Sequence, residues 1–273
     1  MITSTALLRT LINETIAFNI VYISFATLLF VLERTFTYEE LWLTDDGQQW
    51  VDLFHTLLNK GSLQVIFVLT ILLEFNSVIE TNGAAHWINT VPDSLQVILA
   101  LISVEFGLYW AHRLAHEVKF LWPFHAVHHS SKRLWFWNTG RFHVVDTLVS
   151  VTFSYGLMIA LAFPPDIIYW VSVITAFIGI LTHSNIESRL GPFNYIFNTP
   201  ELHRWHHQAD PLIGNSNYGE NLMIYDHLFG TFYFDPNRKP DSAIGIREYM
   251  PDGFTEQLRY PFTMLKQRKE AMD

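Results

Sequence analysis

The chain has 273 residues, of which 50% are hydrophobic, 15% are aromatic and only 16% are charged. Because an ordinary soluble domain carries about 25% charged residues, this composition indicates a protein embedded in a lipid bilayer. The formal net charge of -9 argues against a nucleic-acid binder, which needs a basic face. There is no cysteine, so disulfides, thiolate metal sites and cysteine nucleophiles are excluded, and any metal ligands must be His, Asp or Glu.

Apolar stretches that approach the roughly 20 residues of a membrane-spanning helix recur along the chain. We predict spans at residues 15–32, 62–79, 94–110, 147–162 and 166–181. The first lacks a small-residue cleavage site, so we interpret it as an uncleaved anchor. Since this stretch could instead lie at the membrane surface, we expect about four or five spans.

Two local features shape the path between these spans. Phe163-Pro164-Pro165 separates the last two, and a pair of prolines cannot continue a helix, so residues 147–181 are predicted to form a tight helical hairpin. Residues 35–61 are predicted to form an amphipathic or re-entrant connector, with Trp42 and Trp50 at the membrane interface.

The distribution of basic residues predicts the orientation of the bundle. Residues 81–93 and 163–166 carry no Lys or Arg, and the N-terminus on the same side carries only Arg9. The other basic residues of the 17 fall on the opposite side, which the positive-inside rule makes cytoplasmic. The predicted fold is therefore an all-α, multi-pass transmembrane bundle with a cytoplasmic helical cap that carries the histidines.

We expect a single integrated domain with three regions. Residues 1–93 hold the anchor spans and the connector, residues 94–235 form a catalytic core that includes the hairpin, and residues 236–273 form a solvated cytoplasmic tail. No fused redox module is apparent. Together with the short loops, this favours a bacterial inner-membrane protein.

Histidine is the residue type whose pattern carries the chemistry. Of the 13 histidines, eight lie in three boxes with helical spacing. The boxes are His112 and His116, then His125, His128 and His129, then His203, His206 and His207. Residues spaced i, i+3 and i+4 share one face of a helix. Neutral imidazole is a good ligand for Fe, Zn, Cu or Ni, so eight imidazoles on one side of the membrane predict a site for two metal ions.

Five histidines lie outside the boxes. His143 precedes the predicted hairpin and His183 follows it, so a hairpin that folds back returns both to the level of the boxes, and we predict that both are ligands. His55 and His227 have no comparable support. His86 lies on the far side by the charge argument and is not predicted to bind metal.

Acidic residues are expected to support the imidazoles, because a metal-bound imidazole usually donates its other N–H to a carboxylate or a carbonyl. The candidates are Glu105, Glu117, Asp146, Glu187, Asp210 and Asp226. Glu105 lies within a predicted span, seven residues before His112 on the same helical face, and a carboxylate inside a membrane defaults to a functional role. The alternative is that Glu105 pairs with a buried polar group or is protonated. We assign catalytic roles to Glu105 and Asp226.

The boxes and their surroundings resemble the fatty acid hydroxylase and sterol desaturase superfamily of membrane-bound oxygenases. The similar segments are Trp110–Glu117, His125–Ser131, Arg141–His143, Thr182–Asn185, Thr199–His207, Asn217–Asn221 and Asp226–Phe232. The amino-acid sequences of the last three segments most resemble those of bacterial members and of the alkylglycerol monooxygenase branch. His227 departs from the usual pattern after the aspartate, so no ligand role is carried over to it.

The resemblance implies a dinuclear iron centre, dioxygen as the oxidant and an external electron donor of the ferredoxin, rubredoxin or cytochrome b5 type. It also implies a hydrophobic substrate, such as a fatty acyl chain, sterol, carotenoid or ether lipid. Hydroxylation is the preferred outcome, with desaturation left open, and zinc could occupy the site in recombinant protein.

Two other classes of protein use similar residues. A haem-binding electron carrier places single histidines deep in facing spans. A metal transporter places its ligands near the middle of the membrane, and a zinc-dependent hydrolase is a related alternative. Neither the haem carrier nor the transporter needs three histidine boxes at the cytoplasmic edge of the membrane.

Overall fold

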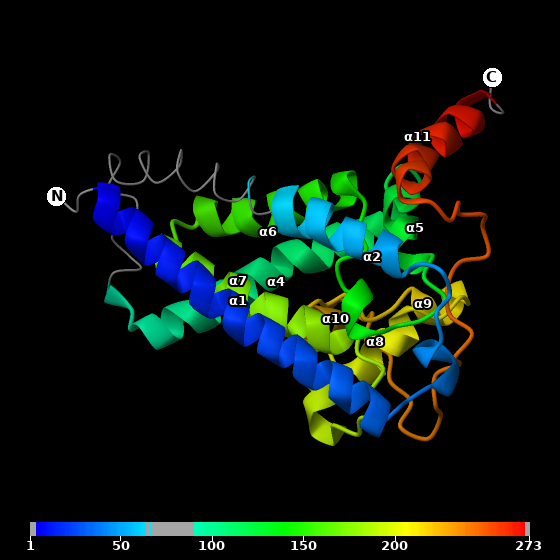
Figure 1. The fold of residues 1–273 in the computed structure, drawn as a ribbon, viewed down its shortest axis with the longest axis horizontal. Coiled ribbons are helices and arrows are strands. Elements are labelled where there is room, and N and C mark those ends of the chain that lie inside the picture. Colours follow the sequence, from blue (N-terminus) through cyan, green and yellow to red (C-terminus); the bar gives the residue numbers. More distant parts are fainter. Residues whose placement is uncertain (1–3, 64–65, 67–89, 271–273) are drawn as a thin grey trace.

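The computed structural model describes residues 4–63, 66 and 90–270, and those residues form helices with no β-strand. Figure 1 shows a bundle of long helices that ends in a cap of short ones. The long helices are α1 (Ser4–Thr35), α4 (Asp93–Glu117), α6 (Val144–Ala160) and α7 (Pro165–Thr182). The N-terminus, the start of α4 and the α6–α7 turn lie at one end of the bundle, and the cap lies at the other.

Three helices are long and apolar enough to cross a membrane, at residues 16–35, 93–117 and 165–182, and α6 is a shorter apolar helix. They coincide with the predicted spans at 15–32, 94–110, 166–181 and 147–162. The predicted span at 62–79 falls almost entirely outside the described residues. His86 also lies outside them. The predicted all-helical membrane fold is confirmed.

The α6–α7 hairpin forms where the two prolines predicted it. Ala162 adopts a left-handed conformation (φ 57°) just after α6 ends, and Pro165 begins α7. Proline suits the first turn of a helix, where its missing N–H has no partner to lose. A hydrogen bond of 2.7 Å between Tyr155 Oη and Ser172 Oγ joins the two helices further along.

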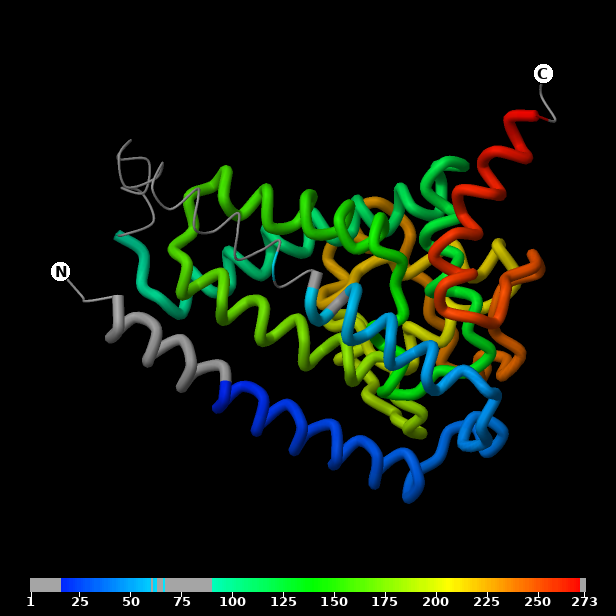
Figure 2. The backbone as a smooth tube through the Cα atoms, turned by 45° about the horizontal axis from the view of Figure 1, so that its top comes forward, coloured from blue at the N-terminus to red at the C-terminus, as the bar shows by residue number. Residues whose placement is uncertain are grey.

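Close packing of α4 against α6 sets the position of the histidine end of α4. These helices and α7 bury a common core that includes Val104, Met158 and Val171. Figure 2 shows α1 outside this core, along α7. A Cβ atom on Gly107 would lie only 2.4 Å from the carbonyl oxygen of Phe153 in α6, so glycine is what permits the two backbones to approach this closely.

The cap consists of short helices joined by ordered loops. They are η5 (Phe136–Asn138), α5 (Trp122–His129), η6 (Gly191–Tyr195), α8 (Pro200–His206), α9 (Pro211–Gly214) and α10 (Ile224–Phe229). The buried carboxylate of Glu33 ties α1 to this cap by accepting hydrogen bonds from the backbone N–H groups of Phe136 (2.8 Å) and Asn185 (2.9 Å).

The predicted connector contains η1 (Glu40–Leu43), α2 (Gln49–Phe54) and η2 (His55–Leu63). Trp50 is 71% exposed, but Trp42 is buried, and its indole N–H donates to the carbonyl of Ser242 at 3.3 Å. Trp42 is therefore packed within the protein and does not face lipid headgroups. The reason is tertiary, because a segment 200 residues further along the chain covers it.

The region predicted to be a solvated tail contains α11 (Phe254–Glu270). Its first half packs on the cap, with Phe262 against Phe124 at a centroid distance of 5.2 Å and Gln257 buried. The second half projects away from the molecule (Figure 2).

Candidate metal centre

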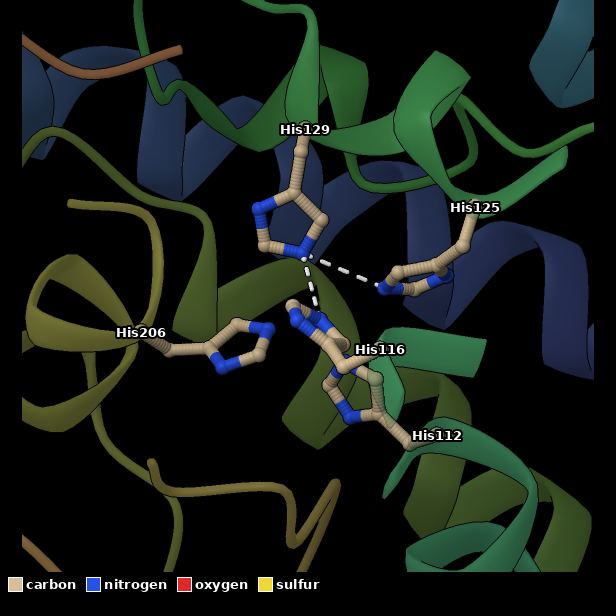
Figure 3. Close-up of side chains that lie close together, drawn as sticks. All are labelled: His112, His116, His125, His129 and His206. Atoms are coloured by element: carbon tan, nitrogen blue, oxygen red, sulfur yellow. Dashed lines mark hydrogen bonds between the residues drawn. The ribbon is translucent and has the colours of Figure 1, made fainter. Parts of the chain in front are cut away.

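Nine histidines converge in two neighbouring groups within the cap. Group one contains His112, His116, His125, His129 and His206. Group two contains His128, His183, His203 and His207. Within each group, one nitrogen of every imidazole lies within 4.8 Å of the corresponding nitrogen of every other. Figure 3 shows the rings of group one pointing toward a common centre.

The i, i+3, i+4 spacing divides each three-histidine box between the groups. On α5, His125 and His129 face group one whereas His128 faces group two. On α8 the division is reversed, because His206 joins group one while His203 and the C-cap residue His207 join group two. The rings of His129 and His207 stack at 4.4 Å between centroids, so the two groups share a boundary.

Backbone carbonyls determine which nitrogen of several imidazoles carries the proton. The Nδ1 atoms of His112, His206 and His128 lie 2.8, 2.7 and 3.2 Å from the carbonyl oxygens of Tyr218, Ser216 and Arg141. A carbonyl oxygen only accepts, so each Nδ1–H donates. The Nε2 atom of each ring therefore presents a lone pair toward the centre of its group.

A carboxylate and two side-chain amides contact the Nδ1 atoms of three more imidazoles. Nδ1 of His125 lies 2.9 Å from Oδ2 of Asp146. Oδ1 of Asn215 lies 3.1 Å from Nδ1 of His116, and Oδ1 of Asn138 lies 3.0 Å from Nδ1 of His183. Neither asparagine was among the predicted supporting residues, because nothing in its spacing relates it to a box.

The interior of the groups suits a cation. Nδ1 of His125 and of His116 faces an acceptor oxygen, so the Nε2 atom of each ring is unprotonated. Nε2 of His129 lies 3.1 Å from both of these atoms and can donate to only one, so at least one close contact between nitrogens has no hydrogen bond. Nε2 of His206 is buried and, among the described residues, has no hydrogen-bond partner. A metal ion that accepts the lone pairs of these nitrogens would relieve the close contact at His129 and give Nε2 of His206 a partner.

Burial keeps the histidines in the form that binds metal. It lowers the pKa well below the usual value for His128, His129, His203, His206 and His207, and neighbouring imidazoles lower it further. Neutral imidazole is the ligating form. The donor set, all nitrogen and uncharged, fits iron and also zinc, copper or nickel.

Three other histidines of the described residues lie outside the two groups. His143 caps α6, since its Nδ1 accepts from the N–H of Val145 and its Nε2 donates to the carbonyl of Leu258, both at 3.0 Å. Both nitrogens of His143 thus form hydrogen bonds within the protein, whereas His143 was predicted to be a metal ligand. His55 is buried beneath α11, and His227 is exposed on α10.

Glu105 and Asp226 each accept hydrogen bonds from the backbone of one loop. Glu105 is fully buried in α4, and its two oxygens accept from the N–H groups of Glu220 (2.7 Å) and Asn221 (2.9 Å). Asp226 accepts from the N–H groups of Tyr218 (2.8 Å) and Gly219 (2.7 Å). Two carboxylates thereby hold four consecutive backbone N–H groups.

This loop, residues 215–221, orients group one. Its carbonyls at Ser216 and Tyr218 accept from His206 and His112, and Asn215 contacts His116. Of the six acidic residues expected to support imidazoles, Asp146 contacts one directly. Glu117 instead pairs with Arg113, Glu187 pairs with Lys239, and Asp210 caps α9.

Comparison with known proteins agrees with this architecture. The profile of the fatty acid hydroxylase family matches residues 97–231, which include all nine grouped histidines. The chain is 44% identical over 260 residues to the ornithine lipid hydroxylase OlsE of Rhizobium tropici, an alignment that covers 93% of this chain and 78% of that protein. The chain belongs to the fatty acid hydroxylase family, as the resemblance indicated.

More distant relatives are alkylglycerol monooxygenases. The zebrafish protein is 33% identical over 194 residues, which cover 70% of this chain and 43% of the relative. The human protein is 36% identical over 133 residues, which cover 49% and 29%. The chain therefore spans less than half the length of these two relatives. No solved structure matches the chain.

Proposed function

We propose that this protein is a membrane-bound, dinuclear iron oxygenase that hydroxylates an unactivated C–H bond of a lipid. The observation that carries the proposal is the convergence of nine imidazoles, eight of them buried, in two adjacent groups. Family membership supports an oxidation reaction, because the relatives are named lipid hydroxylases and alkylglycerol monooxygenases.

The proposed ligands are the nine grouped histidines, with group one holding one ion and group two the other. An ion at group two would be held by four imidazoles rather than five, which would leave more room there for other ligands. Loaded with iron and reduced, the centre supplies dioxygen activation and removal of a hydrogen atom from carbon.

The protein's own residues orient the ligands and exclude water. Carbonyl acceptors hold the proton of His112, His128 and His206 on Nδ1, and Asp146 does the same for His125. Glu105 and Asp226 act here as positioning residues rather than as groups that touch the reacting atoms, because their oxygens bind the loop that orients group one.

The proposed substrate is the acyl chain of a polar lipid. OlsE is named as an ornithine lipid hydroxylase, which favours hydroxylation over desaturation. An external ferredoxin-, rubredoxin- or cytochrome b5-type protein would supply electrons.

We place the protein in a bacterial inner membrane with the histidine groups facing the cytoplasm, on the strength of the basic residues at that end and the bacterial relative. The three regions 1–93, 94–235 and 236–273 then act as one domain.

The direct test counts metal and product together. Purified wild-type protein is expected to contain about two iron ions per chain by elemental mass spectrometry, in keeping with two sets of nitrogen ligands. Expression in a host supplied with ¹⁸O₂ is expected to give lipids carrying one ¹⁸O atom. His206→Ala and His128→Ala should each lose metal and product. Full product formation by either variant, or an iron-loaded wild type that leaves every lipid unoxidised, would refute the proposal.

A further inference from the structure

An uncharged apolar surface covers one side of the cap where η6 meets α10. Its side chains are Phe193, Ile196, Ile224, Leu228 and Phe229, and we call it the η6–α10 surface. Leu228 is 68% exposed, Phe193 59% and Ile196 54%. The two segments form one unit, since the N–H of Met223 donates to the carbonyl of Ile196 at 2.9 Å and Phe197 pairs with Leu222.

Charge is missing from the exposed part of this surface. Residues 190–198 contain no Asp, Glu, Lys or Arg. Residues 222–234 contain one acidic residue, Asp226, whose side chain is fully buried against the loop it holds, and no Lys or Arg. The helix α10 also carries the exposed His227, whose Nε2 lies 2.9 Å from the carbonyl oxygen of Tyr195. A contiguous exposed apolar patch of this kind marks a protein or membrane interaction site.

The contacts of α10 place this surface along a candidate membrane span. The hydroxyl of Tyr225 donates to the carbonyl of Ile102 in α4 at 3.0 Å, and its ring packs on Phe106 at 5.3 Å. Ile102 lies fifteen residues before Glu117 at the end of α4, which is about 22 Å at the rise of an α-helix. Phe106 is itself 39% exposed. The helix α10 therefore lies beside the apolar length of α4, not beyond its end.

We propose that the η6–α10 surface is inserted among the acyl chains of the membrane leaflet nearest the histidine groups. Lipid is the occupant because the surface continues the exposed apolar face of α4, and because an uncharged surface at this depth meets hydrocarbon. The region that the charge pattern assigned wholly to a cytoplasmic cap thus includes a part embedded in the bilayer. Helices of this kind bury their apolar face about 5–10 Å into the interface.

One consequence rests on the proposed function. Phe229 stacks on Tyr109 at 5.4 Å, Tyr109 contacts Tyr218 at 6.1 Å, and the carbonyl of Tyr218 accepts from His112. Only a thin layer of aromatic side chains therefore separates the embedded surface from group one. A lipid substrate would approach the metal centre sideways, without leaving the leaflet.

The absence of native cysteine allows a direct test. Ile196→Cys and Leu228→Cys are each labelled with the environment-sensitive fluorophore NBD, and the full-length protein is reconstituted into phosphatidylcholine vesicles. Leu212→Cys is the matched control, because Leu212 is apolar and 92% exposed but lies on α9, farther from the bundle than α10 (Figure 1). Parallel vesicles contain doxyl-labelled phosphatidylcholine, which quenches fluorophores within the acyl region.

NBD at residues 196 and 228 is expected to emit at shorter wavelength and to be quenched by doxyl lipid, as for a side chain buried in the interface. NBD at residue 212 should do neither. Water-like emission at 196 and 228 would overturn the proposal. So would blue-shifted emission that doxyl lipid does not quench, since a protein would then cover the surface. Metal counted on the same samples separates either result from a failure of the proposed function.

Discussion

The carboxylate behind His125 distinguishes this imidazole from those backed by carbonyls. Asp146 lies 2.9 Å from Nδ1 of His125 and is itself buried. A negative charge at this position makes the imidazole a stronger donor to a metal, and loss of such a partner typically weakens metal binding by about 10–100-fold.

Asp146→Asn is therefore expected to weaken metal binding by about that factor at group one, because the amide keeps the hydrogen bond but removes the charge. The measurement is metal per chain after titration with a chelator. Glu117→Gln is the control, since Glu117 forms an exposed i, i+4 ion pair with Arg113, a type of pair that contributes little. Equal retention of metal in both variants would contradict the role given to Asp146.

His55 is buried without belonging to either group, and it links η2 to α11. Its Nδ1 lies 2.9 Å from the amide nitrogen of Asn59, and its Nε2 lies 2.9 Å from Oε1 of Gln257 in α11. Burial, followed by the positive charge of Arg141, lowers its pKa to about 4. In the unfolded chain the pKa of His is about 6.5.

Between these two values the unfolded chain holds more protons than the folded one, so His55 destabilises the fold as the pH falls from about 6.5 toward 4. The slope for one group is at most about 1.4 kcal/mol per pH unit. Thermal unfolding of His55→Gln in detergent is expected to depend less on pH over this range than that of wild type. The grouped histidines contribute to both proteins and cancel in the comparison. Identical pH dependence would show that His55 is not buried as described.

At the scale of elements, the α4–α6 contact sets where the first histidine box lies. Gly107→Ala would put a methyl group 2.4 Å from the carbonyl of Phe153, so the helices must separate. Overpacking of this kind costs about 1–3 kcal/mol. We expect a lower unfolding temperature and reduced metal content, because His112 and His116 follow on the same helix.

Gly156 in α6 is the matched control for that substitution. A Cβ at Gly156 meets nothing within 4 Å. Gly156→Ala should therefore be neutral or stabilising by up to about 1 kcal/mol through helix propensity. If both alanine variants behave alike, close approach at Gly107 does not determine the packing.

The loop at residues 215–221 is the second element that a single substitution can test. Glu105→Gln keeps the shape of the side chain but turns one acceptor into an NH₂ group, which faces a backbone N–H. The loop is then expected to shift, so that it no longer orients the imidazoles of group one. The metal content should fall from about two ions per chain to about one, because group one no longer binds its ion. Glu33→Gln is the comparison, because Glu33 also accepts two backbone N–H groups but does not bind this loop. Retention of both ions by Glu105→Gln would refute the positioning role.

At the scale of the whole molecule, sidedness is the property that the charge pattern predicts and the fold alone leaves open. Leu212→Cys offers an exposed thiol near the histidine groups on a chain without other cysteines. A membrane-impermeant maleimide should label it in inverted inner-membrane vesicles and not in intact cells, as the positive-inside rule requires. Labelling of intact cells would reverse the proposed orientation.

Local patterns were sufficient for much of this protein. Apolar length predicted α1, α4 and α7, the Pro164-Pro165 pair predicted the α6–α7 turn, and helical spacing predicted that the histidines of each box share a face. These are properties of one helix or one turn, so the residues that decide them are neighbours in sequence. Identification of the family rests on the same short segments.

Tertiary structure decided how the boxes combine. His125 and His128 are three residues apart, yet they enter different groups, because the groups form between α4, α5 and α8 and the end of α7. The same holds for Asn138 behind His183, the loop carbonyls behind His112 and His206, and the segment that buries Trp42. His143 was predicted to be a ligand because it precedes the hairpin, but its partners come from α6 and α11. Such contacts depend on the relative placement of distant helices, about which spacing along a single helix carries no information.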